Sequence, residues 1–223
     1  MDITNNLKLI LDKVHLKRVT IKAIEALHYH SKDNCLSDIL IYSTPRSGST
    51  LLYDIIALNP QIKAISEPLQ IKKISSFLKN ARLRYCELLP KEEIYFQNYI
   101  EYLITNKISN YPFLKKQHHW ITERTAIKCL RAPGLLDWFL ENYDFHVIYL
   151  IRHPIPASLS RIRNGWGTHI KERAEDTYPW FYQSEVYKEE VLNLEIRDLI
   201  QGIVDTGTEL ERQVIMWVLE NIK

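Results

Sequence analysis

A short stretch of the sequence concentrates groups that bind phosphate. It consists of Arg46, Ser47, Gly48, Ser49 and Thr50. Glycine lets the backbone approach an anion closely, and arginine adds a permanent charge on a planar fork of donors. If a helix starts here, its first turn supplies unpartnered backbone N–H groups and the positive end of the helix dipole. These residue types predict an anion site, and an ordinary capped helix is the alternative.

A second set of such groups occurs further along the chain. Arg152 follows the apolar run 147–151, and Ser160 comes about two helical turns later, directly before Arg161. Pro154 suits the first turn of a helix between them. Arg152 is therefore expected at the carboxyl end of a strand, where open α/β sheets bind ligands. A surface arginine and an unremarkable helix serine are the alternative.

Both sets must be positioned by strands and helices. The run 39–42 is short, apolar and bounded by turn residues, which predicts a strand buried on both faces of a parallel sheet. Apolar residues from 51 to 58 have helical spacing. The segments 38–52 and 145–161 thus each read as a buried strand, a polar turn and a helix, and this repetition predicts an α/β fold.

The first loop differs from a nucleoside-triphosphate P-loop. It lacks the first glycine and the Gly-Lys-Ser/Thr ending, in which lysine reaches the terminal phosphates and the hydroxyl holds magnesium. A small-molecule kinase would need both groups. We therefore expect a nucleotide site whose reaction needs no metal.

The sequence Thr44-Pro-Arg-Ser-Gly-Ser-Thr-Leu-Leu52 resembles the 5′-phosphosulfate loop of sulfotransferases that use 3′-phosphoadenosine 5′-phosphosulfate (PAPS), in the form found in carbohydrate and bacterial members. The segment 145–161 resembles the family's 3′-phosphate motif. The resemblance implies a three-layer, P-loop-like α/β fold with a central parallel sheet flanked by helices. It also implies that residues 46–50 bind the 5′-phosphosulfate and that Arg152, Ser160 and Arg161 bind the 3′-phosphate.

The resemblance extends to a candidate base. Ser66-Glu67-Pro68 follows a short apolar stretch and is similar to the pattern of carbohydrate sulfotransferases, in which the glutamate is the general base. A sugar hydroxyl is a poor nucleophile, so a carboxylate within hydrogen-bond reach is needed to accept its proton. Glu67 and Arg46 are accordingly the expected catalytic residues, with a surface glutamate as the alternative reading of Glu67. Lys128 and Arg131 resemble a cationic pair of the family and are equally consistent with exposed cations.

The resemblance implies an enzyme that transfers a sulfuryl group from PAPS to an acceptor hydroxyl. The loop and the Ser-Glu-Pro pattern favour a carbohydrate acceptor, although a lipid headgroup, a natural product or a peptide tyrosine fits the same donor motifs. The family fold continues beyond the last helix expected here with another strand and a late basic loop. A truncated, non-catalytic nucleotide-binding protein is therefore the second hypothesis.

The length and composition of the chain agree with an ordinary soluble α/β domain. The 223 residues are 46% hydrophobic and 25% charged, with a net charge of +2 that is too small to imply a nucleic-acid partner. The cysteines Cys35, Cys86 and Cys129 are widely spaced and leave one unpaired in any disulfide scheme. We expect reduced thiols in a cytoplasmic protein, and the histidines form no recognisable metal set.

We expect residues 1–223 to form a single sulfotransferase-like domain that lacks the C-terminal part of the family fold. Within it, 1–37 would be N-terminal helices and 69–120 a mostly helical insertion that shapes the acceptor pocket. Helices are predicted near 191–204 and 208–222, and the aromatic segment before them would cover the site. No apolar run reaches the roughly 18 residues of a membrane span. The oligomeric state stays open.

Overall fold

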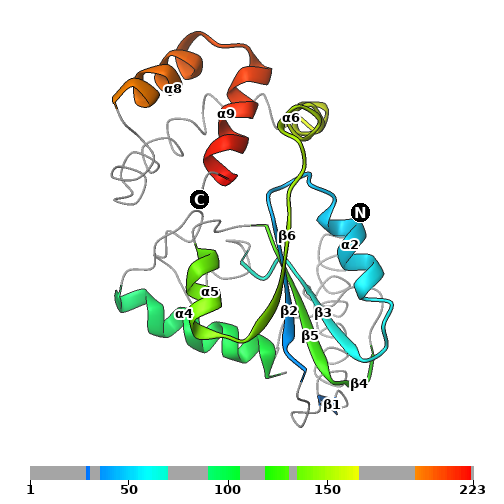
Figure 1. Cartoon of the computed structure of the whole chain (residues 1–223). Helices are drawn as coiled ribbons and strands as arrows, with labels where there is room; N and C mark the ends of the chain where they lie inside the picture. Colours follow the sequence, from blue (N-terminus) through cyan, green and yellow to red (C-terminus); the bar gives the residue numbers. More distant parts are fainter. Residues whose placement is uncertain are drawn as a thin grey trace, which may run out of the picture.

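The centre of the fold is a parallel sheet. The computed structural model describes residues 29–30, 36–69, 90–105, 119–130, 135–165 and 194–221. Within them, four strands pair in the order β3-β5-β2-β6 (Figure 1). Their bounds are Asp38–Ser43 for β2, Ile62–Ser66 for β3, Arg124–Cys129 for β5 and Phe145–Leu150 for β6. All three pairings are parallel, so the carboxyl ends of the strands lie at one edge of the sheet.

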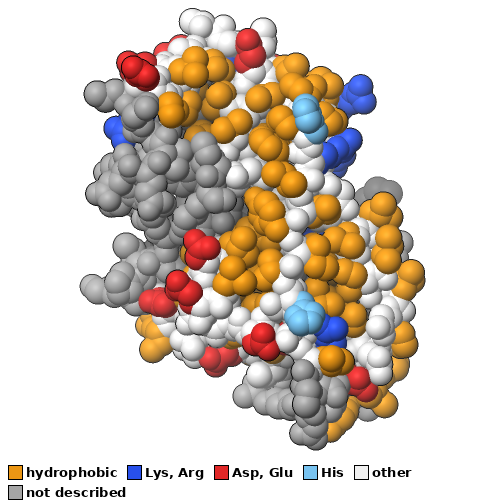
Figure 2. Space-filling model, in the orientation of Figure 1, with side chains coloured by type: hydrophobic (Ala, Val, Ile, Leu, Met, Phe, Trp, Pro, Cys, Tyr) orange, Lys and Arg blue, Asp and Glu red, His pale blue; other side chains and the backbone are white. Residues whose placement is uncertain are grey.

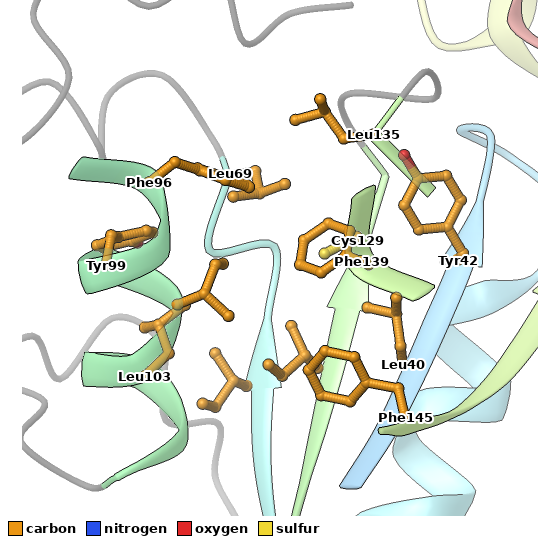
Figure 3. Close-up of a cluster of buried hydrophobic side chains, with 13 residues drawn as sticks. Leu40, Tyr42, Leu69, Phe96, Tyr99, Leu103, Cys129, Leu135, Phe139 and Phe145 are labelled. Carbon is orange, nitrogen blue, oxygen red and sulfur yellow. The ribbon is translucent and has the colours of Figure 1, made fainter. Parts of the chain in front are cut away.

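Among the described elements, two helices cover one face of the sheet. They are α4 (Pro90–Ile104) and α5 (Leu136–Asn142), whose buried side chains join the alternate residues Leu40 and Tyr42 of β2 in one hydrophobic cluster (Figure 3). Phe96 of α4 and Phe139 of α5 are fully buried there and pack edge to face, with ring centroids 5.8 Å apart. This cluster fixes α4 against the sheet.

The opposite face is covered by α2 (Ser49–Ile56). The intervening β2 residues, Ile39 and Ile41, pack with Tyr53 of this helix and Ala57 just after it. Successive side chains of a strand point to opposite faces, so a run that is apolar at every position must be covered on both sides. The predicted three-layer α/β architecture is confirmed by this arrangement.

One strand departs from the prediction. We expected the run 145–150 to be buried like β2, but among the described residues β6 is an edge strand. Ile148 is 36% exposed and Tyr149 is 40% exposed. Figure 2 shows hydrophobic side chains gathered on the face over this strand. An edge strand is covered by a neighbour on one side only, and the apolar composition of the run does not reveal its place in the strand order.

Beyond β6, the part of the chain that the structure describes contains three helices. They are α6 (Pro154–Arg163), α8 (Leu194–Thr206) and α9 (Glu209–Asn221). The predicted helices near 191–204 and 208–222 are confirmed, and α9 packs beside α6 (Figure 1). An ion pair between the buried Arg161 of α6 and the mostly buried Glu220 of α9 joins these two helices.

Two short strands, β1 (Tyr29–His30) and β4 (Ile121–Thr122), form a separate parallel pair. Helix α4 lies within the expected helical insertion 69–120 and begins at Pro90, where proline is favoured because the first N–H of a helix has no partner. Most of the expected N-terminal helices (1–37), the first part of the expected insertion (70–89) and the aromatic segment before α8 lie outside the described residues. Tyr29 and His30, which we expected within the N-terminal helices, form the strand β1 instead.

Candidate active site

The loop between β2 and α2 turns sharply. Arg46 has φ 71° and Gly48 has φ 94°, both in the left-handed region. Glycine adopts this conformation without strain, whereas arginine does so at a cost. The hydroxyl oxygens of Thr44 and Ser47, which are both buried, lie 3.0 Å apart in a hydrogen bond that braces the turn. The loop therefore has a defined shape that its own side chains support.

The start of α2 is suited to an anion. Gly48 is its N-cap residue and provides no side-chain cap, so the helix begins without a capping hydroxyl or carboxylate. The first turn contains no acidic residue. A β-carbon at Gly48 would meet no atom within 4 Å, which leaves the approach to the backbone open. The helix terminus thus presents N–H groups and the positive end of its dipole next to Arg46 and Thr50, both exposed.

The two phosphate motifs predicted from the sequence are in contact. Arg46 Nε donates a hydrogen bond to Ser160 Oγ at 2.9 Å. Arg152 Nη1 donates to the backbone carbonyl of Arg46 at 3.2 Å. Both guanidinium groups are exposed, and they come from the ends of the neighbouring strands β2 and β6. Residues more than a hundred positions apart in the sequence therefore share one site.

Arg161 has different surroundings from its neighbour Ser160. It is only 3% exposed, and its guanidinium pairs with Glu220 of α9. The same Nη2 lies 3.4 Å from the carbonyl of Pro45 in the loop. Arg161 therefore connects α9 to the back of the loop, and its charge is balanced by a carboxylate that is itself mostly buried.

Glu67 lies at the same edge of the sheet, directly after β3. Its backbone N–H donates to the carbonyl of Lys128 at 2.8 Å, which extends the pairing of β3 with β5 by one residue. Its φ of 52° places it in the left-handed region, which is unfavourable for a residue with a side chain. Its side chain is 25% exposed, so the carboxylate is partly accessible from outside.

Lys128 joins Glu67 to the start of α2. Its Nζ lies 3.0 Å from Glu67 Oε1 and 3.2 Å from Thr50 Oγ1, and also 5.6 Å from the centre of the Tyr53 ring. The lysine side chain is only 2% exposed, so a carboxylate, a hydroxyl and an aromatic face replace the water around its ammonium. This cation connects the candidate base to the candidate anion site at the start of α2.

The role of Lys128 was left open by the sequence. Lysine at the end of a strand is equally consistent with a solvated cation, and its burial follows from β5 lying between β3 and β2. The sequence feature that could have indicated the burial of Lys128 is its position at the carboxyl end of an apolar run typical of a buried strand. Arg131, its predicted companion, lies outside the described residues.

Comparison with known proteins identifies the family. A family model described as the sulfotransferase domain matches residues 36–204. This match covers most of the chain. The protein belongs to the sulfotransferase family. No curated protein and no solved structure matches the chain.

The sulfotransferase match includes both motifs that were recognised from the sequence, together with Glu67 and Lys128. Among the described residues of this sulfotransferase, no group of three His, Cys, Asp or Glu side chains is arranged to hold a metal ion. None of its described helices is long and apolar enough to cross a membrane.

Proposed function

We propose that this sulfotransferase transfers the sulfuryl group of PAPS to an acceptor hydroxyl of a carbohydrate. The observation that carries the proposal is the position of Lys128, whose ammonium contacts both the Glu67 carboxylate and Thr50 in the first turn of α2. A candidate base and a candidate anion site are thereby held within reach of one cation. The sulfuryl group would react in the space between them.

The donor end of the site is assigned to residues 46–50. The start of α2 and the Arg46 guanidinium would hold the 5′-phosphosulfate, because both carry positive charge at an exposed position. Arg152 and Ser160 would hold the 3′-phosphate, and their contacts with Arg46 support the proposal that both phosphates bind to one surface. Arg161, whose guanidinium is held by Glu220, would support the loop from behind through Pro45.

The acceptor end is assigned to Glu67. Its carboxylate would accept the proton of the acceptor hydroxyl while the hydroxyl oxygen bonds to sulfur and the bond between sulfur and the 5′-phosphate oxygen breaks. The products are a sulfate ester and adenosine 3′,5′-bisphosphate. Lys128, Arg46 and the first turn of α2 would stabilise the negative charge that develops on the leaving phosphate. Positioning and charge stabilisation account for catalysis here without a metal.

The first experiment tests the donor site. Calorimetric titration with adenosine 3′,5′-bisphosphate and with adenosine 5′-phosphate should give binding that depends on the 3′-phosphate. Arg152→Ala should abolish it, because the assigned charge is lost. Arg163→Ala is the matched control, since it removes an exposed arginine from α6 that has no assigned role. Equal binding of both nucleotides, or equal loss in both variants, would refute the assignment.

The second experiment tests catalysis. Transfer of ³⁵S from labelled PAPS should be measured with simple glycosides, a phospholipid dispersion and a tyrosine peptide, using Glu67→Gln as the inactive control. We expect transfer to a glycoside and a loss of at least about 100-fold in the variant, which is the usual contribution of a general base. Nucleotide binding without transfer to any acceptor would instead support the non-catalytic nucleotide-binding alternative.

A further inference from the structure

The backbone at Glu67 is in an unfavourable conformation that the surrounding structure must maintain. A residue with a side chain is strained when its φ lies in the left-handed region, and Glu67 has φ 52°. The proline that follows also disfavours the right-handed helical region for Glu67, so an extended conformation is the relaxed alternative. Relaxation would redirect the side chain away from Lys128. Contacts on both sides of Glu67 are therefore needed to keep its carboxylate in place.

The contact before Glu67 is provided by the sheet, and the one after it by α4. On the first side, the Glu67 N–H is bonded to the Lys128 carbonyl. On the second side, Tyr99 Oη donates a hydrogen bond of 2.9 Å to the carbonyl of Pro68. Proline has a fixed φ, so the ψ of Pro68 is the one freely rotating backbone torsion between the bonded carbonyl and the peptide unit that joins Glu67 to Pro68.

Tyr99 is a rigid anchor for this bond. It is 2% exposed, and its neighbours Phe96, Ile100 and Leu103 on α4 are completely buried (Figure 3). At the end of α4, Lys63 of β3 donates hydrogen bonds to the carbonyls of Leu103 and Ile104. Burial also raises the pKa of Tyr99, so the hydroxyl keeps the proton that it donates.

We propose that Tyr99 is a positioning residue for Glu67: its hydroxyl holds the Pro68 carbonyl and thereby keeps Glu67 in the left-handed conformation that directs the carboxylate to Lys128. The catalytic meaning of this inference rests on the proposed role of Glu67 as general base. The structural part can be tested separately, without an acceptor and without turnover.

The test is amide hydrogen exchange of the full chain, resolved by residue with NMR. In Tyr99→Phe, which keeps the ring and removes only the hydroxyl, the Glu67 amide should exchange about tenfold faster, as expected for the loss of one buried hydrogen bond. Amides in the centre of β2, such as Leu40, should be unchanged. Tyr95→Phe is the matched control, because it removes a hydroxyl from an exposed position of α4.

A rescue variant separates positioning from general stability. Glycine adopts φ 52° without strain, so in the Glu67→Gly background the substitution Tyr99→Phe should no longer accelerate exchange at residue 67. Unchanged exchange of Glu67 in Tyr99→Phe, equal acceleration throughout the sheet, or an undiminished effect in the glycine background would each overturn the proposal. Failure of the proposed function would appear elsewhere, as full transfer activity in Glu67→Gln.

Discussion

Lys63 should make the stability of this protein depend on pH between neutrality and pH 9. Its ammonium is buried under α4, where Nζ lies 2.7 Å from the carbonyl oxygen of Leu103 and 3.0 Å from that of Ile104. Burial lowers the pKa of Lys63 from 10.5 to about 7, and the Asp38 carboxylate acts in the opposite direction. Neutral Lys63 can still donate hydrogen bonds to both carbonyls at the end of α4, because an amine retains two N–H groups.

The direction of this pH dependence follows from the number of protons that the folded and unfolded chains bind. Between pH 7 and 10.5 the unfolded chain holds a proton on Lys63 that the folded protein has lost, so the free energy of unfolding rises with pH. The slope approaches about 1.4 kcal/mol per pH unit, and the gain from pH 7 to pH 9 is about 2 kcal/mol. Burial raises the pKa of Cys129 from 9.0, which opposes the trend at higher pH and sets the upper limit of the window.

The assay is urea unfolding at pH 7, 8 and 9, followed by tryptophan fluorescence. Wild type should gain stability relative to Lys63→Met, whose position 63 does not titrate. Lys63→Arg should match the methionine variant in slope, because guanidinium keeps its proton throughout this range. The comparison uses slopes, so a difference in absolute stability between variants does not affect it. Parallel pH profiles for all three proteins would refute the low pKa of Lys63.

Two further predictions concern the loop and its support. Gly48→Ala should lower the free energy of unfolding by about 1 kcal/mol, because φ 94° strains alanine although its β-carbon would meet no neighbour. Urea unfolding measures this change. A loss above about 3 kcal/mol would indicate a steric clash that the structure does not contain. Arg161→Met should lower the free energy of unfolding by about 3 kcal/mol, because it leaves the mostly buried Glu220 carboxylate unpaired. The double variant Arg161→Met with Glu220→Leu should recover most of this loss in the same assay. Equal stability of the single and double variants would contradict the pairing.

The local elements were predictable from sequence because their signals are local. The run 39–42 followed by Pro45 and Gly48 predicts a strand that ends in a turn, and helical spacing predicts α2. The start of α4 at Pro90 was not predicted, although the fixed φ and missing N–H of proline suit a first helical turn. The segments 38–52 and 145–161, each a strand followed by a turn and a helix, were sufficient to predict an α/β fold with a parallel sheet.

The placement of Ser160 beside Arg46 was also predictable in outline. The carboxyl ends of parallel strands meet at one edge, so motifs that follow two strands are expected to lie near each other. The hydrogen bond between the two side chains and the left-handed conformation of Arg46 were not predictable, because they depend on the shape of a loop with no sequence pattern for φ.

The tertiary structure alone decided which cations are buried and which face water. Arg152 and Lys128 lie at strand ends and Arg161 lies in α6, and the surroundings of these three cations differ. Arg152 is exposed, Arg161 is held by Glu220, and Lys128 is enclosed by Glu67, Thr50 and Tyr53. The exposure of β6 has the same origin. Burial is set by strand order and by which helices lie above each strand, and these depend on contacts between residues that are distant in the sequence. The amino-acid sequence by itself determined the elements and the chemistry of the motifs, whereas their charge environments came from the packing.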